Sequence, residues 1–329
     1  MDSPALSVDI PPQPWTGRFD GEGAEHRRWW QAVTPYAPHT LPAECPAAPA
    51  GQPGGHRTRP AVILGFGSDE GVHRNKGRVG AAAAPAAIRA ALGPLAFHLD
   101  REVHDAGDVT VDGDALEAGQ ARAGLAITSL LDAGRLPVVL GGGHETAFAS
   151  YLGVAGSAAV RDGLRVGVLN LDAHFDLRDE PEPSSGTPFL QMARAEAAAG
   201  RELKYAVVGI SEPNNTRALF RTAGELGVDY LLDEDCSAEA ARAFVAAFLA
   251  QVDALYLTID LDVLPASVAP GVSAAAAYGV PLPVISAVCR QVAASGKLLH
   301  LDVAELNPAF DVDGRTARVA ARLVNTLLR

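Results

Sequence analysis

Cysteine is scarce in this chain: there are three among 329 residues, at Cys45, Cys236 and Cys289. An odd number of widely separated cysteines without a Cys-x-x-Cys pair argues against a disulfide framework and against a structural zinc site. The first residues, MDSPALSVDIPPQPW, contain acids and prolines where a signal peptide has an apolar segment. We therefore expect reduced thiols and predict a cytoplasmic protein.

Long apolar runs and dense basic clusters are also missing. No run reaches the roughly 18 apolar residues that a membrane span requires, so we expect no association with a membrane. No cluster of five or more Lys and Arg occurs and the net charge is -12, so nucleic acid is not expected as a partner. Hydrophobic residues make up 48% of the chain, which is enough for a large buried core.

Proline and tryptophan are concentrated at the N-terminus. Residues 1–60 hold 11 of the 23 prolines and all three tryptophans, Trp15, Trp29 and Trp30. Prolines at this density disfavour regular helices and strands. We predict that residues 1–60 form an arm that packs on the main domain through its aromatic side chains, and that residues 61–329 form a single catalytic domain.

From residue 61 onwards, short apolar segments alternate with helical ones. AVILGFG at 61–67 is followed by helix-like AAAAPAAIRAAL at 81–92, and the pattern continues to the C-terminus. Apolar strands that alternate with helices indicate a parallel sheet covered by helices on both faces. We predict an α/β fold of three layers, with about eight strands in the central sheet.

Acidic and histidine side chains follow four of the predicted strands at the point where each strand ends. GGGHE (141–145) follows PVVL, DAHFD (172–176) follows GVLNL, DLD (260–262) follows LYLTI, and AELNP (304–308) follows LLHLDV. The carboxyl ends of the strands in an open α/β sheet form the edge at which ligands bind. We expect the four motifs to meet at this edge.

Three of these motifs together supply two histidines and four aspartates. Imidazole and carboxylate ligands suit Mn²⁺, and also Zn²⁺, Fe²⁺ or Co²⁺. Carboxylates that alternate along a buried strand are costly unless they bind something. Six ligands with bridging carboxylates fit two ions, which can share a hydroxide that is nucleophilic at neutral pH. The six predicted ligands are His144, Asp172, His174, Asp176, Asp260 and Asp262.

The motifs GGGHE, DAHFD, DLDVLP and AELNP, in this order between residues 60 and 329, resemble the signature of the ureohydrolases, the family of arginase, agmatinase and formimidoylglutamase. Within that family, the segments DAHFDLR, SSGTPF and SEPNNT are most similar to those of formimidoylglutamases, which hydrolyse a linear amidine in histidine degradation. The resemblance implies the arginase-like three-layer fold, two Mn²⁺ ions per subunit, and a homo-oligomer, either a trimer or a hexamer.

The resemblance also implies a role for each motif residue. One ion would be held by His144, Asp172, Asp176 and Asp260, and the other by Asp172, His174, Asp260 and Asp262, so Asp172 and Asp260 would bridge. The bridging hydroxide would attack the formimidoyl carbon of N-formimidoyl-L-glutamate, which releases L-glutamate and formamide. Asp176 would also pass a proton to the leaving amine, and Glu305 would pair with the cationic amidine of the substrate.

Arg178 follows Asp176 by two residues and lies on the same side if the strand geometry continues. A guanidinium group there would pair with a carboxylate, so it favours formimidoylglutamate, which has two carboxylates, over agmatine, which has none. A structural salt bridge is the alternative role for Arg178. Basic and amide side chains in loops near the strand ends also fit anion binding, which adds Asn75, Arg74 and Asn215 as substrate-binding candidates.

Two departures from the arginase pattern bear on the substrate. DLDVLPAS lacks the Asp-Pro that arginases and agmatinases usually have shortly after this motif, and SSGTPF has Thr187 near the place of a histidine thought to relay protons in arginases. Both disfavour an arginase and suggest another proton route. The alternatives are a ureohydrolase that releases urea from a guanidino acid such as guanidinobutyrate, and a metal-binding protein without catalysis.

Overall fold

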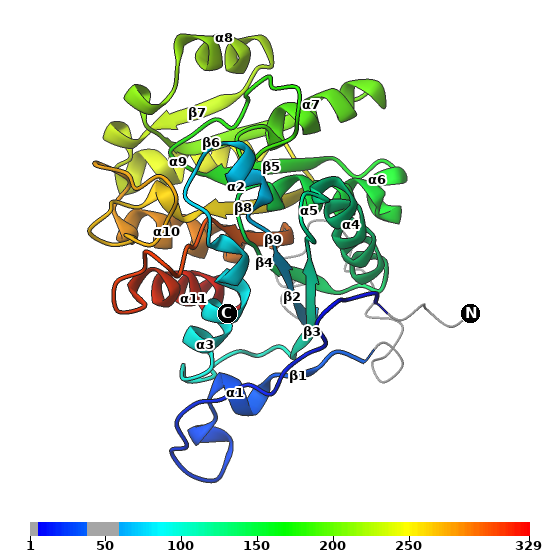
Figure 1. The fold of residues 1–329 in the computed structure, drawn as a ribbon, viewed down its shortest axis with the longest axis vertical. Helices are drawn as coiled ribbons and strands as arrows, with labels where there is room; N and C mark the ends of the chain where they lie inside the picture. Colours follow the sequence, from blue (N-terminus) through cyan, green and yellow to red (C-terminus); the bar gives the residue numbers. More distant parts are fainter. Residues whose placement is uncertain (1–5, 38–58) are drawn as a thin grey trace.

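The computed structural model describes residues 6–37 and 59–329 (Figure 1). Within these ranges one sheet has the strand order β1-β3-β2-β4-β9-β8-β5-β6-β7, and every pair of neighbours is parallel. The strands are β1 (Thr34–Pro35), β2 (Ala61–Gly67), β3 (Val103–Thr110), β4 (Leu136–Leu140), β5 (Val166–Leu171), β6 (Lys204–Ile210), β7 (Asp229–Leu232), β8 (Ala254–Asp260) and β9 (Leu298–Ala304). The predicted parallel sheet is confirmed, with nine strands in place of about eight.

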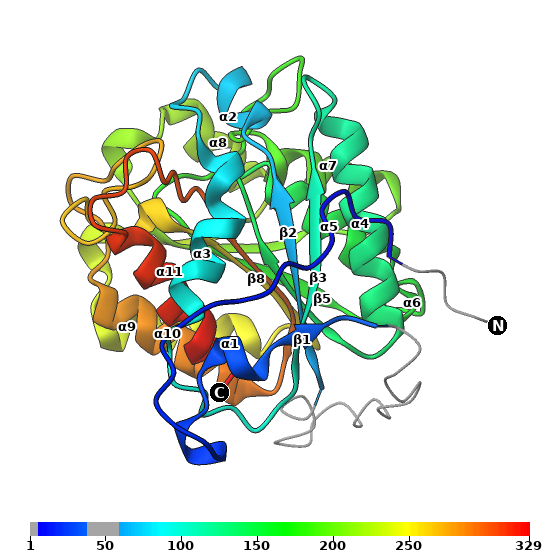
Figure 2. The same ribbon diagram turned by 60° about the horizontal axis from the view of Figure 1, so that its bottom comes forward.

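Helices cover both faces of the sheet, which confirms the three-layer fold (Figure 2). Apolar residues of α3, α9, α10 and α11 pack on one face, and those of α4, α5 and α7 pack on the other. The helices are α1 (Trp29–Ala32), α2 (Glu70–Arg74), α3 (Ala84–Leu92), α4 (Leu116–Asp132), α5 (Thr146–Gly156), α6 (Ala158–Arg161), α7 (Pro188–Ala198), α8 (Arg217–Glu225), α9 (Ala238–Leu249), α10 (Leu282–Ser295) and α11 (Arg315–Leu327). Short 3₁₀ helices, η1 to η5, occupy Ala24–His26, Ala81–Ala83, Glu212–Asn214, Asp233–Asp235 and Leu261–Val263.

The central strands are apolar along nearly their whole length because both of their faces are covered. Every residue of β2, β8 and β9 is buried, as expected for parallel strands between two helix layers. Local signals set the helix ends. The Ser237 hydroxyl accepts a hydrogen bond from the backbone N–H of Ala240 at the start of α9, and Gly296 ends α10 with a φ of 72°.

The aromatic side chains of the N-terminal segment pack on the rest of the chain, as far as residues 6–37 describe it. Trp29 is fully buried, stacks on Trp15 with 6.3 Å between ring centroids, and donates its Nε1–H to Oδ1 of Asn325 in α11 at 3.0 Å. The short strand β1 pairs with β3 at one edge of the sheet. The extra strand therefore comes from the predicted arm, and a domain boundary near residue 60 stays a prediction.

The two cysteines in the described residues, Cys236 and Cys289, are buried and free, and burial raises the pKa of each thiol to about 12. Cys45 lies outside the described residues. Within residues 6–37 and 59–329, no helix has the length and apolar character that crossing a bilayer requires.

Candidate metal centre

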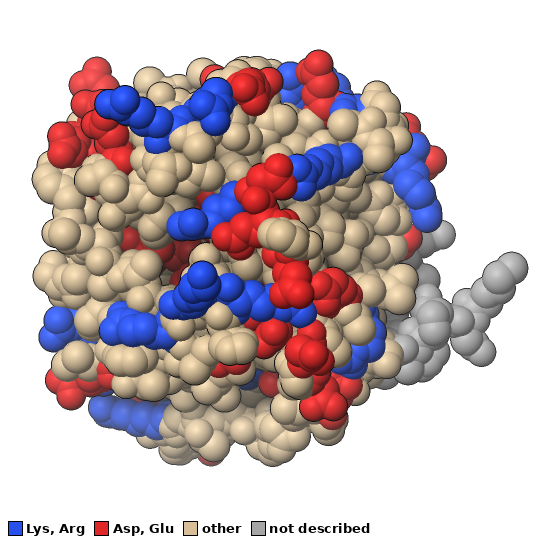
Figure 3. Space-filling model, turned by 45° about the horizontal axis from the view of Figure 1, so that its top comes forward, with Lys and Arg blue, Asp and Glu red and all other residues tan. Residues whose placement is uncertain are grey.

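Four neighbouring strands in the middle of the sheet, β4, β9, β8 and β5, bring the four motifs together. Their carboxyl ends border a cavity of about 340 Å³. Figure 3 shows acidic side chains recessed in a hollow near the middle of one face, with Lys and Arg side chains around it. The predicted residues in the cavity wall are Asn75, His144, His174, Asp176, Arg178, Asn215, Asp260, Asp262 and Glu305. The prediction that these motifs meet at one edge agrees with the structure.

The backbone after β5 differs from the predicted strand. The strand ends at Leu171, and Asp172, His174 and Asp176 lie on the following loop. Asp176 has a φ of 49°, a left-handed conformation that is uncommon for residues other than glycine. The predicted alternation along an extended strand is therefore wrong, and a turn brings these side chains together. Asp262 likewise lies in the 3₁₀ helix η5 and not on a strand.

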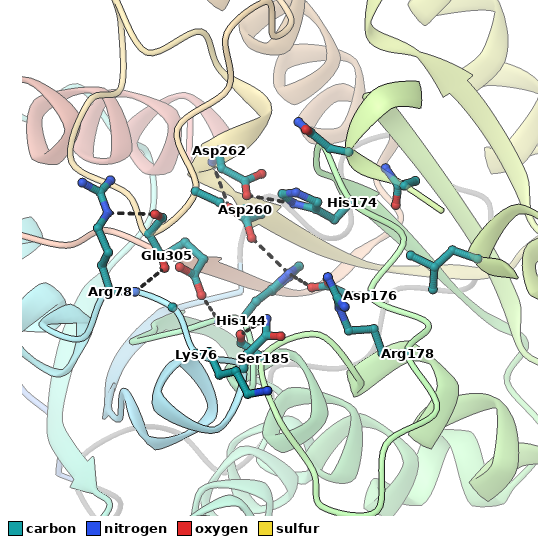
Figure 4. Close-up of a pocket in the computed structure, with 17 residues that line it drawn as sticks. Lys76, Arg78, His144, His174, Asp176, Arg178, Ser185, Asp260, Asp262 and Glu305 are labelled. Atoms are coloured by element: carbon teal, nitrogen blue, oxygen red, sulfur yellow. Dashed lines mark hydrogen bonds and ion pairs between the residues drawn. The ribbon is translucent and has the colours of Figure 1, made fainter. Parts of the chain in front are cut away.

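The first group of metal-type side chains surrounds Nδ1 of His144. The nearest carboxylate oxygens of Asp176, Asp172 and Asp260 lie 2.9, 3.2 and 3.2 Å from this nitrogen. Figure 4 marks the contacts of His144 with Asp176 and Asp260 by dashed lines. His144 is 1% exposed and Asp172 is fully buried. One ligand atom from each of the four residues lies within 4.8 Å of the other three, close enough for all four to bind a single ion.

The second group lies beside the first and consists of Asp172, His174 and Asp262. Nδ1 of His174 is 3.0 Å from Asp262 and 3.5 Å from Asp172. Asp172 belongs to both groups, whereas Asp260 belongs to the first only. Asp260 still reaches toward the second group, because its Oδ1 accepts the backbone N–H of Asp262 at 2.8 Å. A bridging role for Asp260 stays a prediction.

The charges of this centre are unbalanced when only protein groups are present. Burial acts to lower the pKa of His144 and of His174, but the neighbouring carboxylates outweigh it and raise both pKa values well above the ordinary range. Burial raises the pKa of Asp260 and of Asp176, and neighbouring aspartates raise both further. Burial also acts to raise the pKa of Asp172, but hydrogen bonds from the two histidines lower it below its ordinary value. Four largely buried aspartates thus share two imidazoles, an arrangement that added positive charge would stabilise.

The donor set fits divalent metal ions. Each group offers one imidazole nitrogen and carboxylate oxygens, with no thiol among them. Such a mixture suits Mn²⁺ and its divalent neighbours. A histidine that binds a metal ion must be neutral. A bound ion would therefore replace the proton that the neighbouring carboxylates otherwise hold on each imidazole.

Glu305 lies in the cavity wall next to His144. It has a φ of 70°, and its Oε1 accepts the backbone N–H of His144 at 2.8 Å. Burial raises the pKa of Glu305 to about 8, and the charge of Glu145 contributes to the increase. Glu145, which belongs to the GGGHE motif but was not among the predicted site residues, is itself fully buried and accepts hydrogen bonds from the Ser68 hydroxyl and the Gly71 N–H.

Arg178 lies in the cavity wall with its side chain exposed. Among residues 6–37 and 59–329, no group forms a hydrogen bond or ion pair with its guanidinium. Its aliphatic stem passes over Gly186, where an added Cβ would come within 2.7 Å of the Arg178 Cδ. Asn75 is close to the same glycine and donates from Nδ2 to the Ser185 hydroxyl at 3.0 Å. The salt-bridge alternative for Arg178 is not seen within those ranges.

Arg74 does not line the cavity, contrary to the prediction. Its guanidinium is bound by Glu70 at 2.9 Å, by Glu117 at 2.7 Å and by the Asp114 carbonyl at 2.7 Å. It therefore joins α2 to the start of α4 and has no free face for substrate.

Two further residues have structural contacts of their own. Asn215 lines the cavity, but its amide holds the DAHFD loop: Oδ1 accepts the Phe175 N–H at 3.0 Å and Nδ2 donates to the Ala173 carbonyl at 2.9 Å. The Thr187 hydroxyl is bound to Ser184 of the preceding loop and to Gln191 in α7, and it lies outside the cavity wall.

The cavity wall also contains cationic and hydroxyl residues that the predicted site omitted. Lys76, with a φ of 60°, and Ser185 both lie there (Figure 4). Arg78 is present too, but its guanidinium donates to the carbonyls of Ser273 and Val272. The basic loop GVHRNKGRVG was a visible signal, although the sequence could not show which of its cations face inward.

Comparisons with known proteins agree with this geometry. Residues 59–329 match the profile of the arginase family. A formimidoylglutamase of Nocardia farcinica is 57% identical over 314 residues, which cover 95% of each chain. The crystal structure of Trypanosoma cruzi formiminoglutamase with two Mn²⁺ ions is 26% identical and superposes with a TM-score of 0.73 over 82% of this chain and 92% of that one. The formimidoylglutamase of Bacillus subtilis, 20% identical, shares the fold with a TM-score of 0.77 over 92% of this chain and 91% of that one.

Proposed function

The chain belongs to the arginase family, and from that membership we propose that it hydrolyses N-formimidoyl-L-glutamate to L-glutamate and formamide. The observation that carries the proposal is the pairing of opposite charges in one cavity. Buried carboxylates lie at its base, and Arg178, which has no partner among the described residues, lies in its wall. The substrate has the complementary charges, a cationic formimidoyl group at one end and two carboxylates. The similarity to a protein named formimidoylglutamase supports the same substrate.

We assign the metal ligands from the two groups of side chains. His144, Asp172, Asp176 and Asp260 would hold one Mn²⁺ ion, and Asp172, His174 and Asp262 would hold the other, with Asp260 added to the second group as a bridging ligand. Two such ions would lower the pKa of a bound water, so that it could act as the nucleophile at neutral pH. The pair of Mn²⁺ ions in the T. cruzi relative supports this count.

Two acidic residues have roles beyond metal binding in this proposal. The Glu305 carboxylate pairs with the cationic formimidoyl nitrogen and orients the carbon toward the centre. Asp176 takes up the proton that the attacking water loses and transfers it to the glutamate nitrogen. The bond between the formimidoyl carbon and that nitrogen then breaks, and glutamate leaves as a neutral amine. The position of Asp176, in the cavity wall and within the first group of metal-type side chains, supports this role for its carboxylate.

The substrate carboxylates meet the cationic wall of the cavity. Arg178 offers a planar guanidinium that can bind a carboxylate through two hydrogen bonds. Lys76 offers a second positive charge, and no ion pair or hydrogen bond occupies its ammonium within the described ranges. Asn75 also lies in this wall and adds an amide to the same region.

A substrate panel tests the proposed reaction. The purified protein, saturated with Mn²⁺, is incubated with formimidoylglutamate, guanidinobutyrate, agmatine or arginine, and formamide and urea are both measured. We expect formamide from formimidoylglutamate and no comparable release of urea. Preferred release of urea from guanidinobutyrate would identify a guanidino-acid hydrolase instead. Two bound ions without turnover of any substrate would identify a metal-binding protein without catalysis.

Replacing Arg178 with glutamine tests the carboxylate contact. A hydrogen bond to a charged group contributes about 1.5–3 kcal/mol, so we expect KM for formimidoylglutamate to rise by about 10- to 100-fold with a smaller change in kcat. Arg194→Gln is the matched control, because Arg194 pairs with the exposed Asp179 outside the cavity. An unchanged KM in the Arg178 variant would contradict the proposed contact.

Three further properties stay proposals that rest on the family resemblance. These are the identity of the ions as Mn²⁺ in the cell, assembly into a trimer or hexamer, and a cytoplasmic location. The two free, buried cysteines of the described residues are consistent with a reducing compartment.

A further inference from the structure

The two ring nitrogens of His144 face different surroundings. Nδ1 faces the carboxylates of the candidate metal centre, whereas Nε2 lies 3.0 Å from the hydroxyl of Thr258 on β8. That hydroxyl lies 2.6 Å from Oδ1 of Asp302 on β9, and the Tyr256 hydroxyl lies 2.5 Å from Oδ2 of Asp302. Each of these four side chains is at most 1% exposed. A hydrogen-bonded row thus runs from the centre into the protein interior.

Strand pairing fixes this row. Thr258 is the register partner of Asp302, and Tyr256 precedes Thr258 by two residues on the same strand. Side chains two residues apart in a strand lie on the same face. That face is covered by α5, because the Tyr256 hydroxyl is 3.2 Å from the Ala147 carbonyl. The alternate residues of β8 belong to the apolar core on the opposite face.

The row has a direction, because each hydroxyl has one proton. The Tyr256 hydroxyl and Oδ2 of Asp302 share one hydrogen bond, which leaves Oδ1 as an acceptor whichever of the two atoms holds the proton. The Thr258 hydroxyl donates its proton to Oδ1 and can then only accept from His144. Nε2 of His144 must therefore carry a hydrogen, so Nδ1, the nitrogen that faces the carboxylates, is the one that can give up its proton to a metal ion.

We propose that Thr258 is a positioning residue that, supported by Asp302 and Tyr256, holds His144 in the tautomer and orientation in which Nδ1 binds a metal ion. The proposal rests on the metal site of the proposed function and not on the choice of substrate. It assigns a purpose to three buried polar side chains on β8 and β9.

Stability alone does not explain this row. Buried polar groups require hydrogen bonds to offset the loss of water, and replacing such a cluster by apolar residues of similar size is often neutral or stabilising. A hydrogen-bond partner that orients a metal-bound histidine contributes to metal affinity instead, since removing it typically weakens metal binding by 10- to 100-fold. The row reaches His144 and no other ligand among the six, so its effect should be confined to the first ion.

Titration with Mn²⁺ tests the proposal in the full-length protein, with free Mn²⁺ measured by electron paramagnetic resonance. Thr258→Val keeps the shape of the side chain and removes the hydroxyl. We expect one of the two dissociation constants to rise by about 10- to 100-fold and the other to change by less than about threefold. The signal of two coupled Mn²⁺ ions should weaken at concentrations that saturate the wild-type protein. Thr258→Ser should restore tight binding of both ions.

Thr326→Val is the matched control, because its hydroxyl is bound only to the Arg322 carbonyl within α11; it should bind both ions as the wild type does. Wild-type dissociation constants in Thr258→Val, or equal weakening of both ions, would overturn the proposal, as would failure of Thr258→Ser to recover. Wild-type protein that binds two ions but releases no formamide would refute the substrate and leave this proposal supported. Wild-type protein that binds no ion would refute both.

Discussion

Replacement of Asp260 with asparagine is expected to reduce formamide release by about 10³-fold or more. Asp260 is proposed to contact both ions, and a metal ion supplies several kcal/mol of transition-state stabilisation, of which each 1.36 kcal/mol changes the rate tenfold. We expect the variant to retain fewer than two Mn²⁺ ions per chain after gel filtration, as measured by atomic absorption. Full turnover with two tightly bound ions would exclude the bridging role.

The same substitution should increase the stability of the metal-free protein. Burial and the neighbouring aspartates raise the pKa of Asp260 well above its ordinary value. A carboxyl group with a raised pKa in the folded state lowers stability at neutral pH, because the unfolded chain ionises more easily. Asparagine at this position removes that cost, so the metal-free variant should unfold at a higher urea concentration than metal-free wild type. Asp253→Asn is the control for the Asp260 variant. Asp253 forms an exposed ion pair with Arg165, so its replacement should leave both metal content and turnover unchanged.

Replacement of Glu305 with glutamine is expected to lower kcat/KM for formimidoylglutamate by about 10²- to 10³-fold while both ions remain bound. Removing one partner of a buried charge pair costs about 3–5 kcal/mol, and here the other partner is the cationic substrate. The amide oxygen of the introduced glutamine can still accept the His144 N–H, so the backbone beside the metal centre should be preserved. Steady-state kinetics together with metal analysis separate this result from metal loss, which would contradict the assigned role.

Stability as a function of pH provides an independent check on Glu305. Its pKa is raised from 4.5 to about 8, first by burial and then by Glu145. As pH rises from 4.5 toward 8, the unfolded chain loses this proton before the folded protein does, so the stability of the folded protein falls across that window. The metal-free Glu305→Gln variant should lose less stability over the same window in urea titrations. An identical pH dependence in both proteins would show that other groups cause the decline.

The sequence was sufficient to predict the sheet and the six metal-type residues, because both follow from short-range patterns. Apolar strands between helices indicate parallel pairing, and polar residues directly after such strands must lie at one edge. The same reasoning could not give the turn at Asp176. Its left-handed φ depends on contacts such as those of Asn215, which lies some 40 residues further along the chain. Alternation of residue types therefore suggested a strand where a loop exists.

The roles of the cationic residues depended on long-range partners that a pattern does not contain. Arg74 and Arg178 both follow acidic motifs near strand ends, yet only Arg74 meets a distant acid, Glu117, which occupies it. The contact between Thr258 and Asp302 could not be predicted from the sequence either. Each lies within a largely apolar strand, and only the register of β8 against β9 shows that they form a pair.

The contact between Trp29 and Asn325 joins residues that are 296 positions apart. At synthesis rates of 5–20 residues per second, roughly 15–60 s separate the appearance of these two residues at the ribosome. Until α11 has emerged, Trp29 lacks its hydrogen-bond partner in that helix, and β3 is an edge strand open to unwanted pairing for as long as β1 is not paired with it. The N-terminal segment can therefore make its contact with α11 only after residue 325 has been synthesised.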